Sequence, residues 1–156
     1  MMRRPAVALA VAGLVASVAV GCSEPNPKPE VAITVNEFTL EIAPATTDEG
    51  SVKIFLDNEG ELTHGLVFAR ASDPKQLPLA PDGSVDLTKA QVADRLQPVA
   101  PGSYRIQPDL FPGPLVVFCN LVTEGPDGQP VSHFEQGMVA TLNVEATTAA
   151  VTSPVP

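Results

Sequence analysis

Residues 114–145 read "PLVVFCNLVTEGPDGQPVSHFEQGMVATLNVE", and this stretch decides how the rest of the chain is interpreted. It opens with an apolar run and closes with an alternating run from Gly137 to Glu145, and both patterns are typical of β-strands. The segment between them contains the turn-rich "EGPDGQP", which predicts a separate excursion of the chain. Cys119, His133 and Met138 stand where the two runs meet this excursion. We therefore expect the three side chains to gather at one end of a β-structure.

Short β-rich runs separated by Gly, Pro, Asp and Asn also fill most of the preceding chain. They cover Val31–Ile42, Ser51–Asn58, His64–Arg70 and Ser103–Gln107. Such a series predicts a β-sandwich or a β-barrel. The first run slips out of alternation near Asn36, which we interpret as an edge strand with a bulge or bend.

One segment departs from this rhythm. In "DLTKAQVADRL", Asp86–Leu96, the apolar residues Leu87, Ala90, Val92 and Leu96 mark one face, and the first residue is a suitable helix cap. We predict a short helix inserted between strands.

The ends of the chain predict export. Residues 1–21 combine two arginines with a short apolar run of small residues, as in a signal peptide. "AVGC" resembles a bacterial lipobox, which would make Cys22 the lipid-modified first residue of the mature protein. The alternative is ordinary cleavage after Gly21, which would leave Cys22 as a free thiol. We expect a Pro-rich tether over residues 22–30, one domain over residues 31–145 and a disordered tail over residues 146–156.

The charge of the chain limits its partners. Without residues 1–21, seven Lys and Arg face eighteen Asp and Glu, a net charge of −11. Nucleic-acid binding is excluded, because phosphate contacts need clustered cations. We expect an exported monomer, anchored by its lipid to the outer face of the cytoplasmic membrane or in the periplasm, with a basic protein partner.

Few metal-ligating side chains remain once the leader is set aside. The domain keeps two histidines, one cysteine and one methionine, namely His64, Cys119, His133 and Met138. Two imidazoles, a thiolate and a weak thioether form the ligand set of a blue-copper site. Zinc would accept the first three ligands but would gain little from the thioether, so the methionine favours copper.

Each of these residues also has an ordinary structural interpretation. A cysteine after an apolar run is often an inert buried side chain, a histidine at a strand start is often a surface residue, and a methionine often fills a core. Their joint occurrence, with no other residue of these types in the domain, favours the metal site.

The motifs "FLDNEGELTHGLVF", "DLFPGPLVVFC" and "HFEQGMVATLNV" resemble those of cupredoxins, the plastocyanin and azurin superfamily. The resemblance covers residues 31–145 and implies an all-β, Greek-key β-sandwich. It also implies one type 1 copper, bound by ring nitrogens of His64 and His133, by the thiolate of Cys119 and axially by Met138.

The sequence departs from the cupredoxin pattern in two places. Thirteen residues separate Cys119 from His133, where small cupredoxins have only a few. Gly65 stands where many members have an asparagine whose side chain ties the ligand loops together. We name Asn120 and Ser132 as candidates for replacing that bond.

The resemblance implies one-electron transfer, with the imidazole edge of His133 facing solvent or a redox partner. The acidic residues Asp57, Glu59 and Glu61 would either steer a basic partner or simply form a solvated turn. Two alternatives remain, a copper carrier for homeostasis and a metal-free interaction module. No enzyme is expected, because cupredoxin-fold oxidases need additional histidines for further copper centres.

Overall fold

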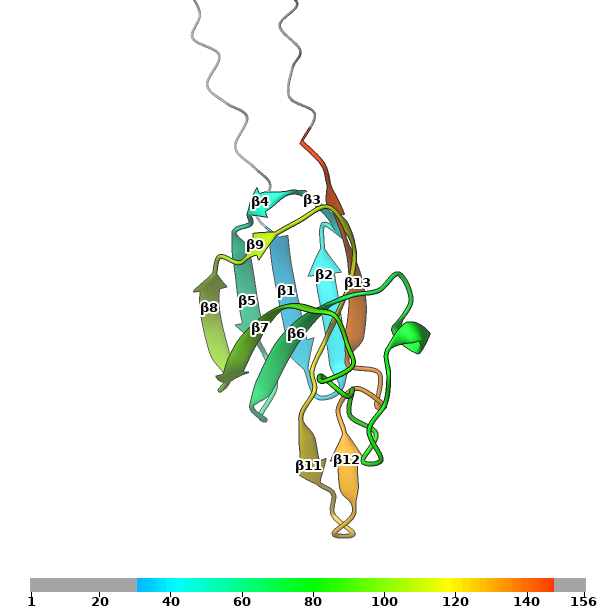
Figure 1. Cartoon of the computed structure of the whole chain (residues 1–156). Coiled ribbons are helices and arrows are strands. Elements are labelled where there is room, and N and C mark those ends of the chain that lie inside the picture. Colours follow the sequence, from blue (N-terminus) through cyan, green and yellow to red (C-terminus); the bar gives the residue numbers. More distant parts are fainter. Residues whose placement is uncertain (1–30, 148–156) are drawn as a thin grey trace, which may run out of the picture.

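The computed structural model describes residues 31–147 of the chain. The predicted signal peptide, Cys22, the tether and most of the tail lie outside the described residues, so these remain predictions. Figure 1 shows the described part as two facing β-sheets with a hairpin extending from one end.

The first sheet has four strands and the second has five. In spatial order, the first contains β2 (Thr39–Ala43), β1 (Val31–Asn36), β5 (Ile54–Asn58) and β8 (Gly102–Ile106). The second contains β3 (Thr46–Asp48), β13 (Val139–Glu145), β10 (Gly113–Phe118), β6 (His64–Arg70) and β7 (Val92–Val99). Only the β1–β5 and β13–β3 neighbours run parallel among these named pairs. The predicted all-β sandwich is confirmed.

The core lies between the two sheets. Strands β1 and β5 bury every second residue, as expected for a sheet with one face in the core. Strand β6 and the end of β10 are buried on both faces, because a second apolar cluster packs outside them. Cys119 and Met138 belong to the main core cluster. Two of the four candidate ligands are therefore part of the main hydrophobic core.

The shorter elements lie outside the two main sheets, the 3-10 helix at the side of the sandwich and the short strands at its two ends (Figure 1). They are β4 (Gly50–Ser51), the 3-10 helix η1 (Pro74–Gln76), β9 (Asp109–Leu110), β11 (Val122–Glu124) and β12 (Pro130–Ser132). Strands β11 and β12 pair antiparallel and project from the end opposite β4 and β9 (Figure 1). This hairpin is the excursion that the turn-rich segment predicts.

The predicted helix over Asp86–Leu96 is wrong. The Asp86 carboxylate accepts hydrogen bonds from the N–H and hydroxyl of Thr88, and the N–H of Ala90 donates to the Asp86 carbonyl oxygen. This is a single turn, after which β7 begins at Val92. Because β7 completes an edge of the second sheet by pairing with β6, tertiary pairing overrides the apolar spacing of the segment.

The interpretation of Val31–Ile42 as one bulged edge strand is also wrong. The segment forms β1 and β2, which pair antiparallel around a two-residue turn at Glu37 and Phe38. Phe38 has a φ of 61°, which a non-glycine residue seldom adopts. Strand β1 is an inner strand between β2 and β5. The slip in alternation therefore marks a tight turn, and this turn lies at the candidate site described below.

Within residues 31–147, we find no helix with the length and apolar character needed to cross a membrane.

Candidate metal centre

The four predicted ligands come from the strand ends and loops of the second sheet. His64 is the first residue of β6, and Cys119 follows the last residue of β10. His133 follows β12, and Met138 precedes β13. Since β6, β10 and β13 are neighbours in one sheet, their pairing brings these sequence-distant positions together.

Three candidate ligand atoms converge. Nδ1 of His64 lies 3.2 Å from Nδ1 of His133. Sγ of Cys119 lies 3.4 Å from Nδ1 of His133 and 3.9 Å from Nδ1 of His64. All three residues are at most 1% exposed, and their ligand atoms lie within 4.8 Å of one another. The same ring nitrogen of each histidine thus faces one thiol, as a common metal ion would require.

Met138 is joined to this group through its backbone. Its N–H donates to the carbonyl oxygen of His133 (3.0 Å), and its own carbonyl oxygen accepts from the N–H of Cys119 (3.1 Å). The side chain is fully buried in the core cluster that also contains Cys119. Metal binding by its thioether remains a prediction.

Burial sets the protonation of the three converging groups. Desolvation raises the pKa of the Cys119 thiol, although the backbone N–H groups of Leu121 and Gly65, which face the sulfur, oppose the shift. Desolvation also lowers the pKa of His64 and of His133, favouring neutral imidazoles. Neutral imidazoles can ligate a metal, and a bound cation would stabilise the thiolate that burial alone disfavours. The donor set therefore fits a soft, redox-active cation such as copper.

The other nitrogen of each imidazole has its own neighbour, which we call the outer partner. Nε2 of His133 lies 3.2 Å from the hydroxyl of Thr123 in β11. Nε2 of His64 lies 3.7 Å from a carboxylate oxygen of Glu37, beyond hydrogen-bond distance, and has no hydrogen-bond partner. Neither Glu37 nor Thr123 was predicted from the sequence. The break in strand alternation at Asn36–Glu37 was the one signal for the former, and nothing in the sequence distinguished the latter.

Glu37 is held in place by the turn that precedes His64. Its Oε1 accepts hydrogen bonds from the N–H of Glu61 (2.7 Å) and the N–H of Leu62 (2.9 Å). These bonds, that of Leu62 foremost, lower the pKa of Glu37. The carboxylate therefore stays ionised beside His64 at neutral pH.

The two candidates for tying the ligand loops together have a different role. The side chain of Asn120 accepts from the N–H of Val85 (2.7 Å) and donates to its carbonyl oxygen (3.0 Å). The hydroxyl of Ser132 donates to the carbonyl oxygen of Gly83 (2.8 Å). Both residues thus attach the ligand loops to the segment that precedes β7, and not to one another.

The predicted exposure of the His133 edge is wrong. This side chain is fully buried, with Thr123 at its Nε2 and the ring of Phe38 packed edge-on at 5.1 Å between ring centroids. The thirteen-residue insertion that forms the β11–β12 hairpin covers the position where solvent contact was expected. Sequence position alone could not show which way the excursion folds.

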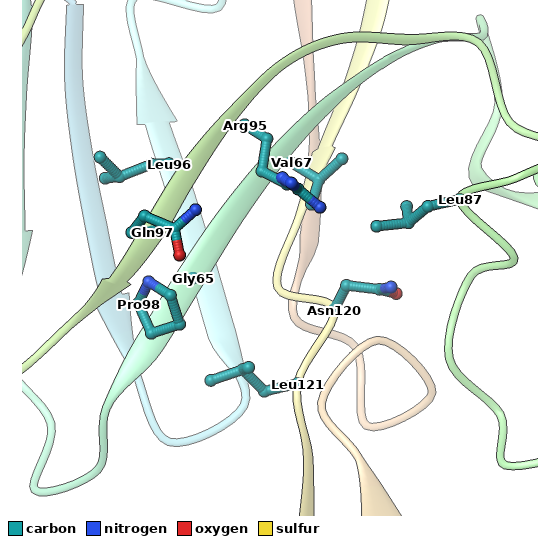
Figure 2. A pocket seen from close by; sticks show the side chains of 9 residues that line it. All are labelled: Gly65, Val67, Leu87, Arg95, Leu96, Gln97, Pro98, Asn120 and Leu121. Atoms are coloured by element: carbon teal, nitrogen blue, oxygen red, sulfur yellow. The ribbon is translucent and has the colours of Figure 1, made fainter.

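A groove of about 230 Å³ lies beside the backbone of the cysteine loop. Figure 2 shows Asn120 and Leu121 on one side and Arg95, Gln97 and Pro98 of β7 on the other. The groove also includes Gly65, Val67, Leu87 and Leu96. Because Asn120 lines the groove and directly follows Cys119 in the chain, this groove reaches within one residue of the candidate thiol.

The fold is similar to that of several solved structures. Reduced auracyanin from the photosynthetic bacterium Roseiflexus castenholzii has 17% sequence identity and a TM-score of 0.51, with 74% of this chain and 96% of that one covered. Auracyanin A, described as a "blue" copper protein from Chloroflexus aurantiacus, has 15% identity and a TM-score of 0.46, with coverage of 75% and 100%. Spinach plantacyanin has 14% identity and a TM-score of 0.40, with coverage of 75% and 100%.

No family model and no curated protein matches the sequence. The identification therefore depends on the structure: a two-sheet β-sandwich similar to auracyanin, with two imidazole nitrogens and a thiol converging at one end. The chain has the cupredoxin fold, and at one end of it His64, Cys119 and His133 converge as the strong ligands of a type 1 copper site would, with Met138 joined to them through its backbone.

Proposed function

We propose that this protein binds one type 1 copper ion and carries single electrons at the cell envelope. The observation that carries the proposal is the convergence of two Nδ1 atoms and one buried Sγ within 4.8 Å. His64, His133 and Cys119 would supply the strong ligands and Met138 the weak axial one. Bound copper would supply a couple between Cu(I) and Cu(II).

The surrounding sandwich suits electron transfer because it limits ligand movement. His64 and Cys119 are attached to β6 and β10, which pair along four residues and are buried on both faces. Met138 leads directly into β13, the other neighbour of β10. Ligands held by packed strands change position little between two oxidation states, so less reorganisation accompanies each transfer.

The route to a redox partner differs from the one that the family resemblance implies. With His133 covered, the site comes near the surface at half-exposed Glu37 beside His64, and at the groove beside Cys119. We place the route at the His64 side, because the exposed carboxylates of Glu59 and Glu61 lie in the turn before it. These charges suit a basic redox protein.

The proposed cellular location depends on the sequence alone. A signal peptide over residues 1–21 and lipid attachment at Cys22 would hold the domain at the cell envelope. Mass spectrometry of the envelope protein checks this part, since an unmodified thiol at Cys22 would contradict it.

Copper carriage is the runner-up function. A carrier must release its metal readily, whereas the two imidazoles and the thiol are at most 1% exposed. Their burial favours retention through many redox cycles. We do not propose catalysis, because both histidines of this chain are used in the one site and leave none for a second copper centre.

The first test is a visible and electron paramagnetic resonance spectrum of the leaderless protein after addition of Cu(II), with Cys119→Ser as the control. We expect an intense thiolate-to-Cu(II) charge-transfer band that is absent from the control. A folded protein with a reduced thiol and no such band would contradict the copper proposal and leave the metal-free module. Rapid loss of copper to a chelator in a protein that shows the band would favour the carrier.

A further inference from the structure

We propose that Glu37 is a positioning residue that fixes the ring of His64 and biases bound copper toward Cu(II). This inference rests on the proposed copper site and adds to it a residue outside the four ligands. Glu37 belongs to the β1–β2 turn in the first sheet, whereas His64, Cys119 and Met138 lie at strand ends of the second. Both sheets of the sandwich therefore contribute residues to the proposed site.

The turn before His64 is built around the Glu37 carboxylate. Two backbone N–H groups, of Glu61 and Leu62, donate to the same oxygen atom. Gly60 leaves room for the carboxylate, because a Cβ at that position would collide with it. A charged group that accepts two backbone hydrogen bonds from the turn before His64 has little freedom to move away from the imidazole.

The imidazole of His64 needs such a neighbour. Its Nδ1 faces the cysteine sulfur, and its Nε2 is the one buried side-chain nitrogen or oxygen in residues 31–147 that lacks a hydrogen-bond partner. If Nδ1 donates its lone pair to a metal, the proton must sit on Nε2. A buried N–H without an acceptor is unfavourable, and a carboxylate oxygen of Glu37 lies 3.7 Å away. A small rotation of the ring would close this gap to a charge-assisted hydrogen bond.

The charge on Glu37 also distinguishes the two oxidation states. A carboxylate that accepts from a metal-bound imidazole raises the basicity of that ligand and favours the more highly charged ion. The outer partner of His133, Thr123, is a neutral hydroxyl and has no such effect. Because Glu37 is 34% exposed, water weakens its influence, so we expect a modest preference for Cu(II).

The test compares Glu37→Gln with Glu61→Gln in the purified protein. The first substitution keeps an oxygen that can accept from both N–H groups and removes the charge. The second removes the same charge from an exposed side chain of the same turn. For Glu37→Gln we expect a roughly tenfold shift in relative affinity toward Cu(I), equivalent to a reduction potential about 59 mV more positive for a one-electron couple. For Glu61→Gln we expect less than a twofold shift.

A second measurement separates this inference from the copper proposal. Zn(II) can bind His64, His133 and Cys119 without any redox change, and loss of an outer partner typically lowers metal affinity by about 10- to 100-fold. We expect Glu37→Gln, and not Glu61→Gln, to lower Zn(II) affinity at least tenfold. Equal effects of the two variants on both potential and Zn(II) affinity would overturn the role of Glu37. A wild-type protein without the blue band would overturn the copper function, while the Zn(II) comparison would still decide whether Glu37 supports His64.

Discussion

The two histidines of the site are supported in different ways. His64 begins an inner strand of the second sheet and follows a turn whose N–H groups donate to the Glu37 carboxylate, which lies beside the outer nitrogen of His64. His133 follows a hairpin that extends beyond the sheets, and a hydroxyl and the ring of Phe38 cover it. The sandwich itself thus positions the first ligand, and an insertion encloses the second.

The metal site therefore has two sides with different roles, one at His64 and one at the β11–β12 hairpin. The His64 side brings negative charge to the metal site and to the nearby surface, whereas the hairpin side excludes water and is attached through Asn120 and Ser132. Changes on the first side should alter stability, potential and partner approach. Changes on the second should alter the enclosure of the site and, to a smaller extent, its stability.

The largest expected effect is that of Asn58→Ala. The side chain of Asn58 is 2% exposed, donates to the carbonyl oxygens of Leu62 and Val99, and accepts from the N–H of Gly60. Its removal leaves one buried and two partly buried backbone groups without this partner, so we expect the free energy of unfolding to fall by about 2–3 kcal/mol. Urea unfolding of the metal-free protein measures this change.

The matched control is Asn143→Ala on the exposed face of β13, where we expect a change within about 0.5 kcal/mol. If the two variants unfold at the same urea concentration, the Asn58 hydrogen bonds do not stabilise the turn before His64, and the proposed difference between the supports of His64 and His133 is wrong.

Sequence patterns predicted the sandwich and the ligands for a definite physical reason. Strands with one buried face show a period of two, and β1 and β5 retain it almost without interruption. The ligand set followed from composition, because the domain contains no other His, Cys or Met. Neither inference required knowledge of which strands are neighbours.

The predictions from the sequence failed where contacts between segments distant in the sequence determine the structure. Leu87, Ala90, Val92 and Leu96 have a helix-like spacing, yet Val92 and Leu96 belong to a strand because the edge of β6 is available for pairing. Burial of His133 likewise depends on the direction in which the hairpin folds. Glu37 was not predicted as a site residue, because its place beside His64 depends on hydrogen bonds to a turn more than twenty residues away in the sequence.

An intermediate effect is expected for Thr123→Val, which replaces the hydroxyl beside His133 with a methyl group of similar size. Loss of one partly buried hydrogen bond should lower the free energy of unfolding by about 1 kcal/mol. Because no charge is removed, we expect the reduction potential to change less than in Glu37→Gln. Urea unfolding and a redox titration of the copper-loaded protein measure the two quantities.

Thr141→Val on the exposed face of β13 serves as the reference for that substitution. A shift in potential for Thr123→Val as large as that for Glu37→Gln would remove the proposed electrostatic difference between the two outer partners.

The smallest expected effect concerns the approach of a redox partner, and it tests on which side electrons pass. Glu59 and Glu61 lie in the turn before His64, and Glu124 and Asp127 lie in the hairpin; all four are exposed. We compare the double replacement of each pair by lysine, with hexaammineruthenium(II) as a small cationic reductant of the Cu(II) form.

Both double variants change the net charge equally. A difference between their reduction rates therefore depends on where the replaced charges lie and not on the total charge. If electrons enter beside His64, the rate at low salt should fall roughly threefold more for the first pair than for the second. The difference should shrink above about 0.1 M salt, where the Debye length is about 10 Å and charges near the entry point are screened. A larger loss for the hairpin pair would instead place the entry point at the hairpin. Enclosure of His133 would then direct the partner toward that ligand, and the two sides of the site would exchange the roles assigned to them.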